Sequence, residues 1–186
     1  KHDRAAWDAA RSTISRLSVN HDGEAILASM LVLMLINGQL RDQWPMIRFQ
    51  LTELRDVAID LLVAVAVEHV KLTPQTVIYK EDDLTQLFIT ICNFGDATHA
   101  NMKSYLKHPN HNVREAAARA VGEARDPRYL DDLNDLLRET ASAESWVVRA
   151  AAAESFARFE GSRRRAGPML LAALKDEAAR REESKS

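Results

Sequence analysis

The second half of the chain repeats itself, and this repeat limits the possible folds most strongly. Residues 113–121 read Val-Arg-Glu-Ala-Ala-Ala-Arg-Ala-Val, and residues 148–156, which lie 35 positions later, read Val-Arg-Ala-Ala-Ala-Ala-Glu-Ser-Phe. Both segments carry Val-Arg, then small residues, then a bulky apolar residue. A period between 30 and 50 residues with two helices per unit is typical of an α-solenoid, in which each repeat buries its apolar face against its neighbours.

Leucine-rich segments alternate with these alanine-rich ones. Residues 129–137 precede the second copy, and residues 169–174 follow it. Pro127 and Pro168 lie 41 positions apart instead of 35, which predicts an insertion of six residues, and Arg163, Arg164 and Arg165 fall in that predicted loop. Residues 94–106 form a weaker third copy upstream. We therefore expect paired helices from residue 83 to about residue 175.

These residues resemble HEAT repeats, particularly the short bacterial kind first noticed in phycobilin lyases. The clearest unit runs from Pro127 to Leu137, through a turn at 138–145, to a helix at 146–159. The resemblance covers residues 83–175 and implies a right-handed solenoid whose second helices form the inner, concave layer. The family pattern ends this helix with Gly and often has Asp just before Val-Arg, where this chain has Asn110, Asn112 and Glu144.

The first half of the chain is built differently. Residues 1–93 hold 32 Ile, Leu, Val and Met against 14 in the rest, whereas Ala numbers 9 against 19. Apolar spacing predicts helices at 3–17, at 22–36 and at 45–70, the last one continuous or broken near Gln50, and a loop at 71–80. We favour helix over strand for 61–67 because the helical stripe continues through it.

The predicted organisation is an all-α solenoid with an aliphatic-rich helical N-terminal cap. We expect residues 1–80 to form the N-terminal region and residues 81–186 to form the repeats with a last helix at 169–183, the two together making one continuous structural unit. The segment 25–36 is apolar all round, so we expect other elements or a partner chain to enclose it. This helix and the apolar segment 51–70 are also candidates for a homodimer interface or for docking to the rest of a longer chain.

Composition excludes several classes of protein. The net charge of −2 provides no global attraction for nucleic acid or an anionic membrane. Cys92 is the single cysteine and lies in an apolar run, so we expect a buried side chain, no internal disulfide and a reducing, cytoplasmic setting. The longest apolar stretch has twelve residues, too few to span a membrane. The start at Lys1 resembles no signal peptide and indicates a processed product or a piece of a longer polypeptide.

The sequence carries no recognisable catalytic motif, so we predict no catalytic residue and no cofactor. This favours a binding function over an enzyme. His99, His108 and His111 are the nearest approach to a metal-binding group. Without a cysteine or a closely spaced carboxylate, an ordinary polar turn explains them better than a zinc site, and we predict no metal.

Repeat-equivalent positions supply the candidate binding residues. Arg114 and Arg149 occupy the same place in the two repeats; they either hold a ligand carboxylate or form an internal ladder between repeats. His111 and Trp146 are equivalent too, and a large ring that opens its helix beside a turn is either a binding anchor or a cover for the core. Arg158 completes the predicted surface. The triple arginine at 163–165 is a candidate for an anion or an acidic partner, or a solvated loop.

We therefore expect a non-enzymatic scaffold or adaptor that binds a peptide or a protein on the concave solenoid surface. One alternative, implied by the resemblance, is an enzyme or enzyme subunit of the bilin lyase type that holds a tetrapyrrole. A further alternative is a HEAT-like nucleic-acid-binding protein, against which the nearly neutral second half argues.

Overall fold

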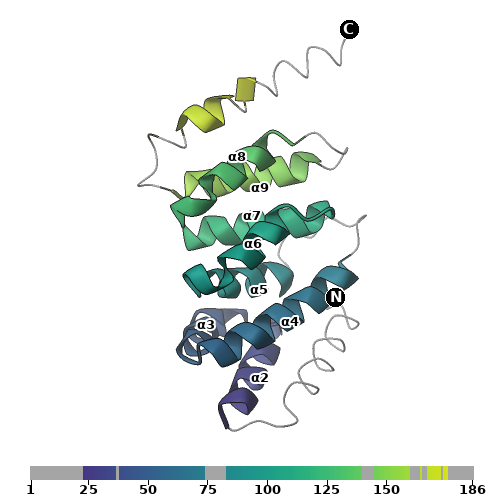
Figure 1. Ribbon diagram of the computed structural model, residues 1–186, viewed down its shortest axis with the longest axis vertical. Helices are drawn as coiled ribbons and strands as arrows, with labels where there is room; N and C mark the ends of the chain where they lie inside the picture. The colour runs from purple at the N-terminus through teal and green to yellow at the C-terminus, as the bar shows by residue number, and fades with distance from the viewer. Residues whose placement is uncertain are drawn as a thin grey trace. The chain divides into compact units, whose positions relative to one another are not determined.

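The computed structural model describes residues 23–36, 38–73, 83–139, 145–159, 164, 167–172 and 174–175. Over these ranges every regular element is a helix, which confirms the all-α prediction (Figure 1). The chain divides into two compact units, Lys1–Met102 and Lys103–Ser186. The boundary predicted after residue 80 rests on the repeat pattern and stays a prediction.

The first unit is built from helices with bulky aliphatic side chains. Its elements are α2 (Gly23–Leu35), the 3-10 helix η2 (Gly38–Gln43), α3 (Trp44–Glu53), α4 (Asp56–Leu72), α5 (Asp83–Cys92), the 3-10 helix η3 (Gly95–Thr98) and the start of α6 (His99–Leu106). Helix α2 packs against α3 and α4, and α4 packs against α5. Their fully buried side chains include Leu35, Ile47, Leu51, Leu62, Leu87, Phe88 and Ile91. Burying each such side chain contributes about 1.5–3 kcal/mol.

The helix predicted at 45–70 is broken, as one alternative allowed, but the break lies at Leu54–Arg55 and not near Gln50. Arg55 has φ 47° and ψ −121°, a backbone conformation that no helix can continue through, so α3 ends and α4 begins with Asp56. Residues 61–67 are helical inside α4, which confirms helix over strand.

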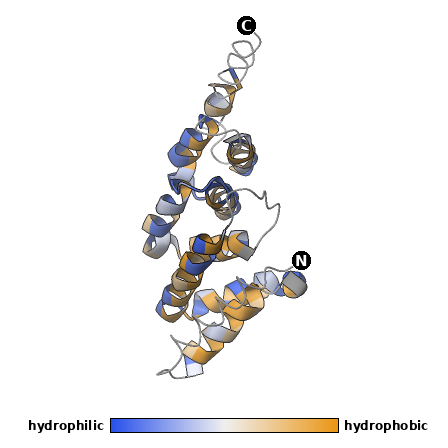
Figure 2. Ribbon diagram, turned by 90° about the vertical axis from the view of Figure 1, so that its right-hand side faces the viewer, coloured by the Kyte–Doolittle hydropathy of each residue, from blue (hydrophilic) through white to orange (hydrophobic). Residues whose placement is uncertain are grey.

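Helix α2 lies where the sequence predicts it, but the described residues do not enclose it. Ile26, Leu27 and Met30 are 52%, 47% and 57% exposed, while Leu31 and Leu35 on the other side are buried. Figure 2 shows hydrophobic residues along the helices of this unit. Across the described part of the chain, no helix is both long enough and apolar enough to cross a bilayer.

Two smaller predictions also need correction. Cys92 is half-buried rather than buried, because it is the last residue of α5 and lies beside a turn. Helix α4 runs to Leu72, so the predicted loop at 71–80 starts two residues later than expected. The rest of that segment, 74–80, lies outside the described residues, as does the predicted helix at 3–17.

The second unit contains the helical pairs that the repeat predicts. After the end of α6 come α7 (His111–Ala124), the 3-10 helix η4 (Pro127–Tyr129), α8 (Leu130–Leu137) and α9 (Ser145–Ala157). Asn110 caps α7, since its side chain accepts a hydrogen bond from the Asn112 amide at 3.0 Å. Residues 167–172 and 174–175 are helical, within or beside the predicted last helix; the remainder of 169–183 lies outside the described residues.

Close packing by small residues is confirmed. Ala116, Ala117, Ala120, Ala151 and Ala152 are all buried, and α7 lies beside α9 along its length (Figure 1). The bulky residues at the end of each copy, Val121 and Phe156, are buried as well.

Gly122 does not end α7, in contrast to the family pattern. The helix continues to Ala124, and Arg125 closes it in the left-handed conformation with φ 53° and ψ 31°. Gly122 instead lies where α7 approaches α9 closely, because a Cβ at this position would stand 2.8 Å from the Cα of Ser155.

Candidate interaction surface

Arg114 takes part in an internal network. Its Nε donates to Glu139 at 2.8 Å and its Nη2 donates to the other oxygen of the same carboxylate. Its Nη1 donates to the backbone carbonyls of His108 and Pro109 at 2.5 and 2.7 Å. Both ion-pair partners are almost buried, with 10% and 13% of their side chains exposed. Arg114 thus binds the turn before its own helix and the end of α8 in the following repeat.

Arg149 makes an equivalent contact in its own repeat. Its Nη1 donates to the backbone carbonyl of Glu139 at 2.8 Å, just beyond the end of α8. A cation near the C-terminal carbonyls of a helix is favourable because these carbonyls lack partners within the helix. Glu139 therefore links the two arginines, its carboxylate to Arg114 and its backbone to Arg149, which is the internal ladder that one alternative predicted.

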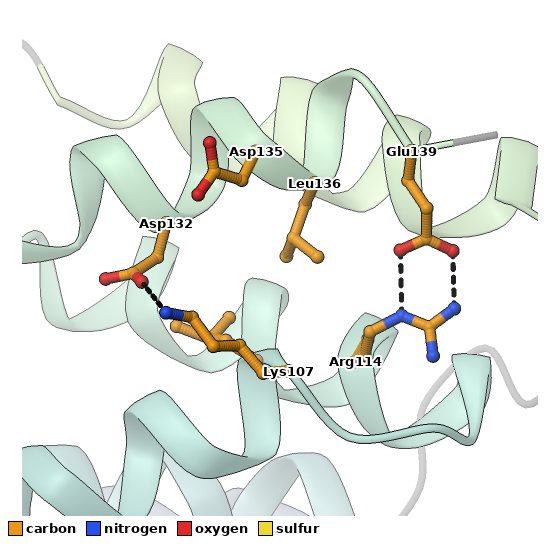
Figure 3. Close-up of a pocket in the computed structure, with 7 residues that line it drawn as sticks. Lys107, Arg114, Asp132, Asp135, Leu136 and Glu139 are labelled. Atoms are coloured by element: carbon orange, nitrogen blue, oxygen red, sulfur yellow. Dashed lines mark hydrogen bonds and ion pairs between the residues drawn. The ribbon is translucent and has the colours of Figure 1, made fainter. Parts of the chain in front are cut away.

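An open pocket of about 240 Å³ lies beside this ladder (Figure 3). Its lining comes from the end of α6, from α7 and from α8, and comprises Leu106, Lys107, Arg114, Asp132, Asp135, Leu136 and Glu139. Four of its five charged groups are paired across it: Arg114 with Glu139, and Lys107 with Asp132 at 3.6 Å. Lys103 approaches the same Asp132 carboxylate, also at 3.6 Å. These pairs hold α8 to the preceding helices, so the charges of the pocket serve mainly to join its walls.

Burial perturbs two groups near this pocket. Desolvation, with a further contribution from the charge of Arg114, lowers the pKa of His108 below its usual value. The His108 Nδ1 accepts a hydrogen bond from the Asn110 amide at 3.1 Å, which requires that nitrogen to be unprotonated. Desolvation also raises the pKa of Tyr105 on α6.

A second set of charges joins α7 to α9. Arg119 donates to Glu154 at 2.6 Å and to Glu115 at 3.1 Å. Arg158 pairs with Glu123 and donates to Glu154 at 3.1 Å. Two of these pairs join positions 35 apart, and the sign of the charge reverses from one copy to the next. Equivalent positions of neighbouring repeats lie next to each other in a stacked array. Because the charge at each of these positions has opposite sign in the two copies, the neighbouring side chains attract each other.

Small side chains bring the backbones of the two helices together near Gly122. The Ser155 hydroxyl donates to the Ala118 carbonyl at 2.7 Å, and Ser155 lies directly over Gly122. Ala118 and Gly122 are both buried. This side of α7, which also carries His111 and Glu115, is therefore the side that faces α9.

The corresponding side of α9 is exposed. The positions 35 residues beyond His111, Glu115, Ala118 and Gly122 are Trp146, Ala150, Ala153 and Ala157. Their spacing of four, three and four residues places them on one side of the helix, opposite Ser155. Trp146 is 56% exposed, Ala150 and Ala157 are exposed, and Ala153 is half-buried. We call this set the outer face of α9.

The predicted site residues thus have different environments. His111 is buried, and its Nε2 has no hydrogen-bond partner among the described residues, whereas its equivalent Trp146 is exposed. Arg114 and Arg158 are held in ion pairs within the chain. Arg164 is exposed, and Arg163 and Arg165 lie outside the described residues. No group of three or more His, Cys, Asp or Glu is placed to hold a metal ion in the described ranges.

The sequence interpretation missed the residues that organise the surface. Glu139 lies in the predicted turn at 138–145, and its role depends on a contact with Arg114, 25 positions away, that no local pattern shows. The outer face of α9 has no distinctive pattern for a different reason, because alanine at these positions is equally typical of a packed core. The reversal of charge between Arg119 and Glu154 was visible in the repeat alignment and predicts their pairing.

Comparison with protein-family models places residues 100–184 in one family, described as HEAT repeats. No curated protein and no solved structure matches the chain. The matched segment contains α7, α8 and α9, whose paired and stacked helices agree with the α-solenoid architecture that the repeat predicted. Residues 100–184 of this chain are therefore similar to HEAT repeats.

Proposed function

We propose that this chain is a protein-binding module and that the outer face of α9 is its main contact surface. The observation that carries the proposal is the exposed Trp146 at the head of a row of small side chains. A large ring beside small residues gives a partner both an anchor and room for close approach. On this proposal, the residues that contact a partner directly are those of the outer face of α9, with Trp146 as the anchor.

The other sequence candidates support this surface in different ways. Arg158 and Glu154 lie at its edge, 34% and 49% exposed, and keep capacity for further polar contacts. Arg114 and His111 act within the repeats, because both are almost buried. The arginines at 163–165 remain a candidate for contact with an acidic partner.

A photo-crosslinking residue at Ala150 tests the proposal. In an extract of the source organism we expect a discrete covalent adduct with a second protein, and we expect Trp146→Ala to reduce its yield several-fold. The same crosslinker at Asp131, which is exposed on α8, serves as the matched control. Equal adducts at both positions, or none at Ala150, would contradict the proposed surface.

A further inference from the structure

The interface between α7 and α9 shows what kind of structure fits the outer face of α9. On α7, the side formed by His111, Glu115, Ala118 and Gly122 is covered by another helix of similar length. On α9, the equivalent side has the same helical spacing, with Ala150 in place of Glu115, Ala153 in place of Ala118 and Ala157 in place of Gly122. A helix that packs on this face would therefore continue an interface that the chain already forms once.

The charges at the edge of this face define the partner further. Helix α7 carries Arg119 and, four residues later, Glu123. Helix α9 carries Glu154 and Arg158 at the equivalent positions, so that Arg119 pairs with Glu154 and Glu123 with Arg158. Glu154 is still 49% exposed after contacting two arginines. A further helix that packs on α9 in the same register lies against Glu154 and then Arg158. To pair with these two charges, it needs a basic residue followed, four positions later, by an acidic one.

Resting on the proposed function, we infer that the outer face of α9 binds an α-helix of a partner protein with the pattern base, small residue, any two residues, acid. The small residue lies over Ala157, the position equivalent to Gly122; because Ala157 carries a Cβ that Gly122 lacks, the partner helix packs less closely there than α9 packs on α7. The base lies against Glu154 and the acid against Arg158, while the first turn of the partner helix covers Trp146.

Two labelled peptides of identical composition test this inference on the full chain. One is residues 145–159 with Glu154→Arg and Arg158→Glu, which has the required pattern; the other is the unchanged residues 145–159, which would oppose like charges. Exposed pairs are individually weak, so we expect the changed peptide to bind about tenfold more tightly by fluorescence anisotropy at low salt. High salt should reduce this difference.

Variants of the protein identify where the peptide binds. Ala153→Arg places a long charged side chain in the middle of the face and should abolish binding of the changed peptide. Asp131→Arg on α8 should leave it unchanged, and thermal unfolding followed by circular dichroism shows that both variants fold. Binding that survives Ala153→Arg would place the peptide elsewhere and overturn the inference.

The remaining outcomes are also decisive. If neither peptide binds, the inference is wrong, whether or not Ala153→Arg changes the melting temperature. If Ala150 forms an adduct with a protein but the two peptides bind equally, the surface binds protein without this charge pattern. In that case the proposed function stands and the inferred partner does not.

Discussion

At the scale of single residues, the close packing of α7 on α9 at Gly122 depends on the absence of one side chain. Gly122 sits under Ser155, and an added Cβ would lie 2.5 Å from the Ser155 Cβ and 2.8 Å from its Cα. The obstacle includes backbone, which no change of rotamer can move. A glycine inside a helix costs about 0.5–1 kcal/mol relative to alanine, so its presence here reflects packing rather than helix propensity.

We therefore predict that Gly122→Ala destabilises the protein, although alanine favours helices. The overpacked interface should lower the free energy of unfolding by about 1–3 kcal/mol in urea titrations. Gly23→Ala is the control, because nothing lies within 4 Å of the added atom. A Gly122→Ala variant as stable as the original would show that α7 and α9 separate without cost.

His108 makes stability depend on pH. Its pKa is lowered in the folded chain by burial and by Arg114, so folding favours the neutral ring. Its stabilising contribution is complete above the unfolded pKa of about 6.5 and is lost as the pH falls through the lower folded pKa. We predict that the free energy of unfolding decreases between pH 7 and pH 5 because of this residue.

The variant His108→Asn isolates the contribution of His108. Its side-chain oxygen can replace Nδ1 as acceptor for the Asn110 amide but does not titrate in this range. We expect unfolding midpoints measured at several pH values to fall less steeply in this variant. Parallel pH profiles for the two proteins would assign the dependence to other groups.

At the scale of elements, the ladder from Arg114 through Glu139 to Arg149 connects neighbouring helical pairs. Each arginine binds carbonyls that follow a helix, and one carboxylate joins the two repeats. Removing one partner from an almost buried ion pair leaves the other charge without compensation. The ladder is therefore a structural connection whose loss affects more than one helix.

We predict that Arg114→Met and Glu139→Met each destabilise the protein by about 3 kcal/mol. The double variant should lose clearly less than the sum, by at least about 1 kcal/mol, because neither charge is then left alone. The exposed pair Glu68 and Lys71 on α4 provides the comparison, with an expected coupling of about 0.3 kcal/mol. Additive losses at Arg114 and Glu139 would contradict the ladder.

At the scale of the whole molecule, the first unit exposes apolar side chains on α2 and α3. On α2 the exposed apolar residues are Ile26, Leu27 and Met30. On α3 they are Met46 and Phe49, which are 54% and 65% exposed. Exposed apolar side chains in such numbers often mark an interface. The dimer or docking surface predicted on the helices at 25–36 and 51–70 stays a prediction; Met46 and Phe49 on α3 lie outside both of these segments.

We predict that the chain self-associates through these side chains. Its mass by light scattering should exceed the 20.9 kDa of one chain and should return to that value in the double variant Met30→Glu, Phe49→Glu. The control Gln43→Glu, Gln50→Glu adds the same charge at exposed polar positions of the same region and should keep the larger mass. A monomeric parent chain at high concentration would refute this prediction.

The sequence by itself determined the helical class, the repeat and most helix positions. Apolar and alanine spacing acts locally, within one or two turns, so α2, α8 and α9 appear close to their predicted bounds. The sequence did not predict the break at Arg55, because nothing in the composition around an arginine indicates that its φ is positive. The sequence also left open whether Arg114 binds a ligand or a neighbouring repeat.

Only the tertiary structure decided which sides of these helices are covered. His111 and Trp146 occupy the same position in their repeats, yet one is buried and the other exposed, because α9 packs on α7 and no described helix packs on α9 in the same way. The same holds for Glu139, whose partners lie on other elements. Burial and pairing depend on contacts between segments far apart in the chain, and a local pattern cannot specify them.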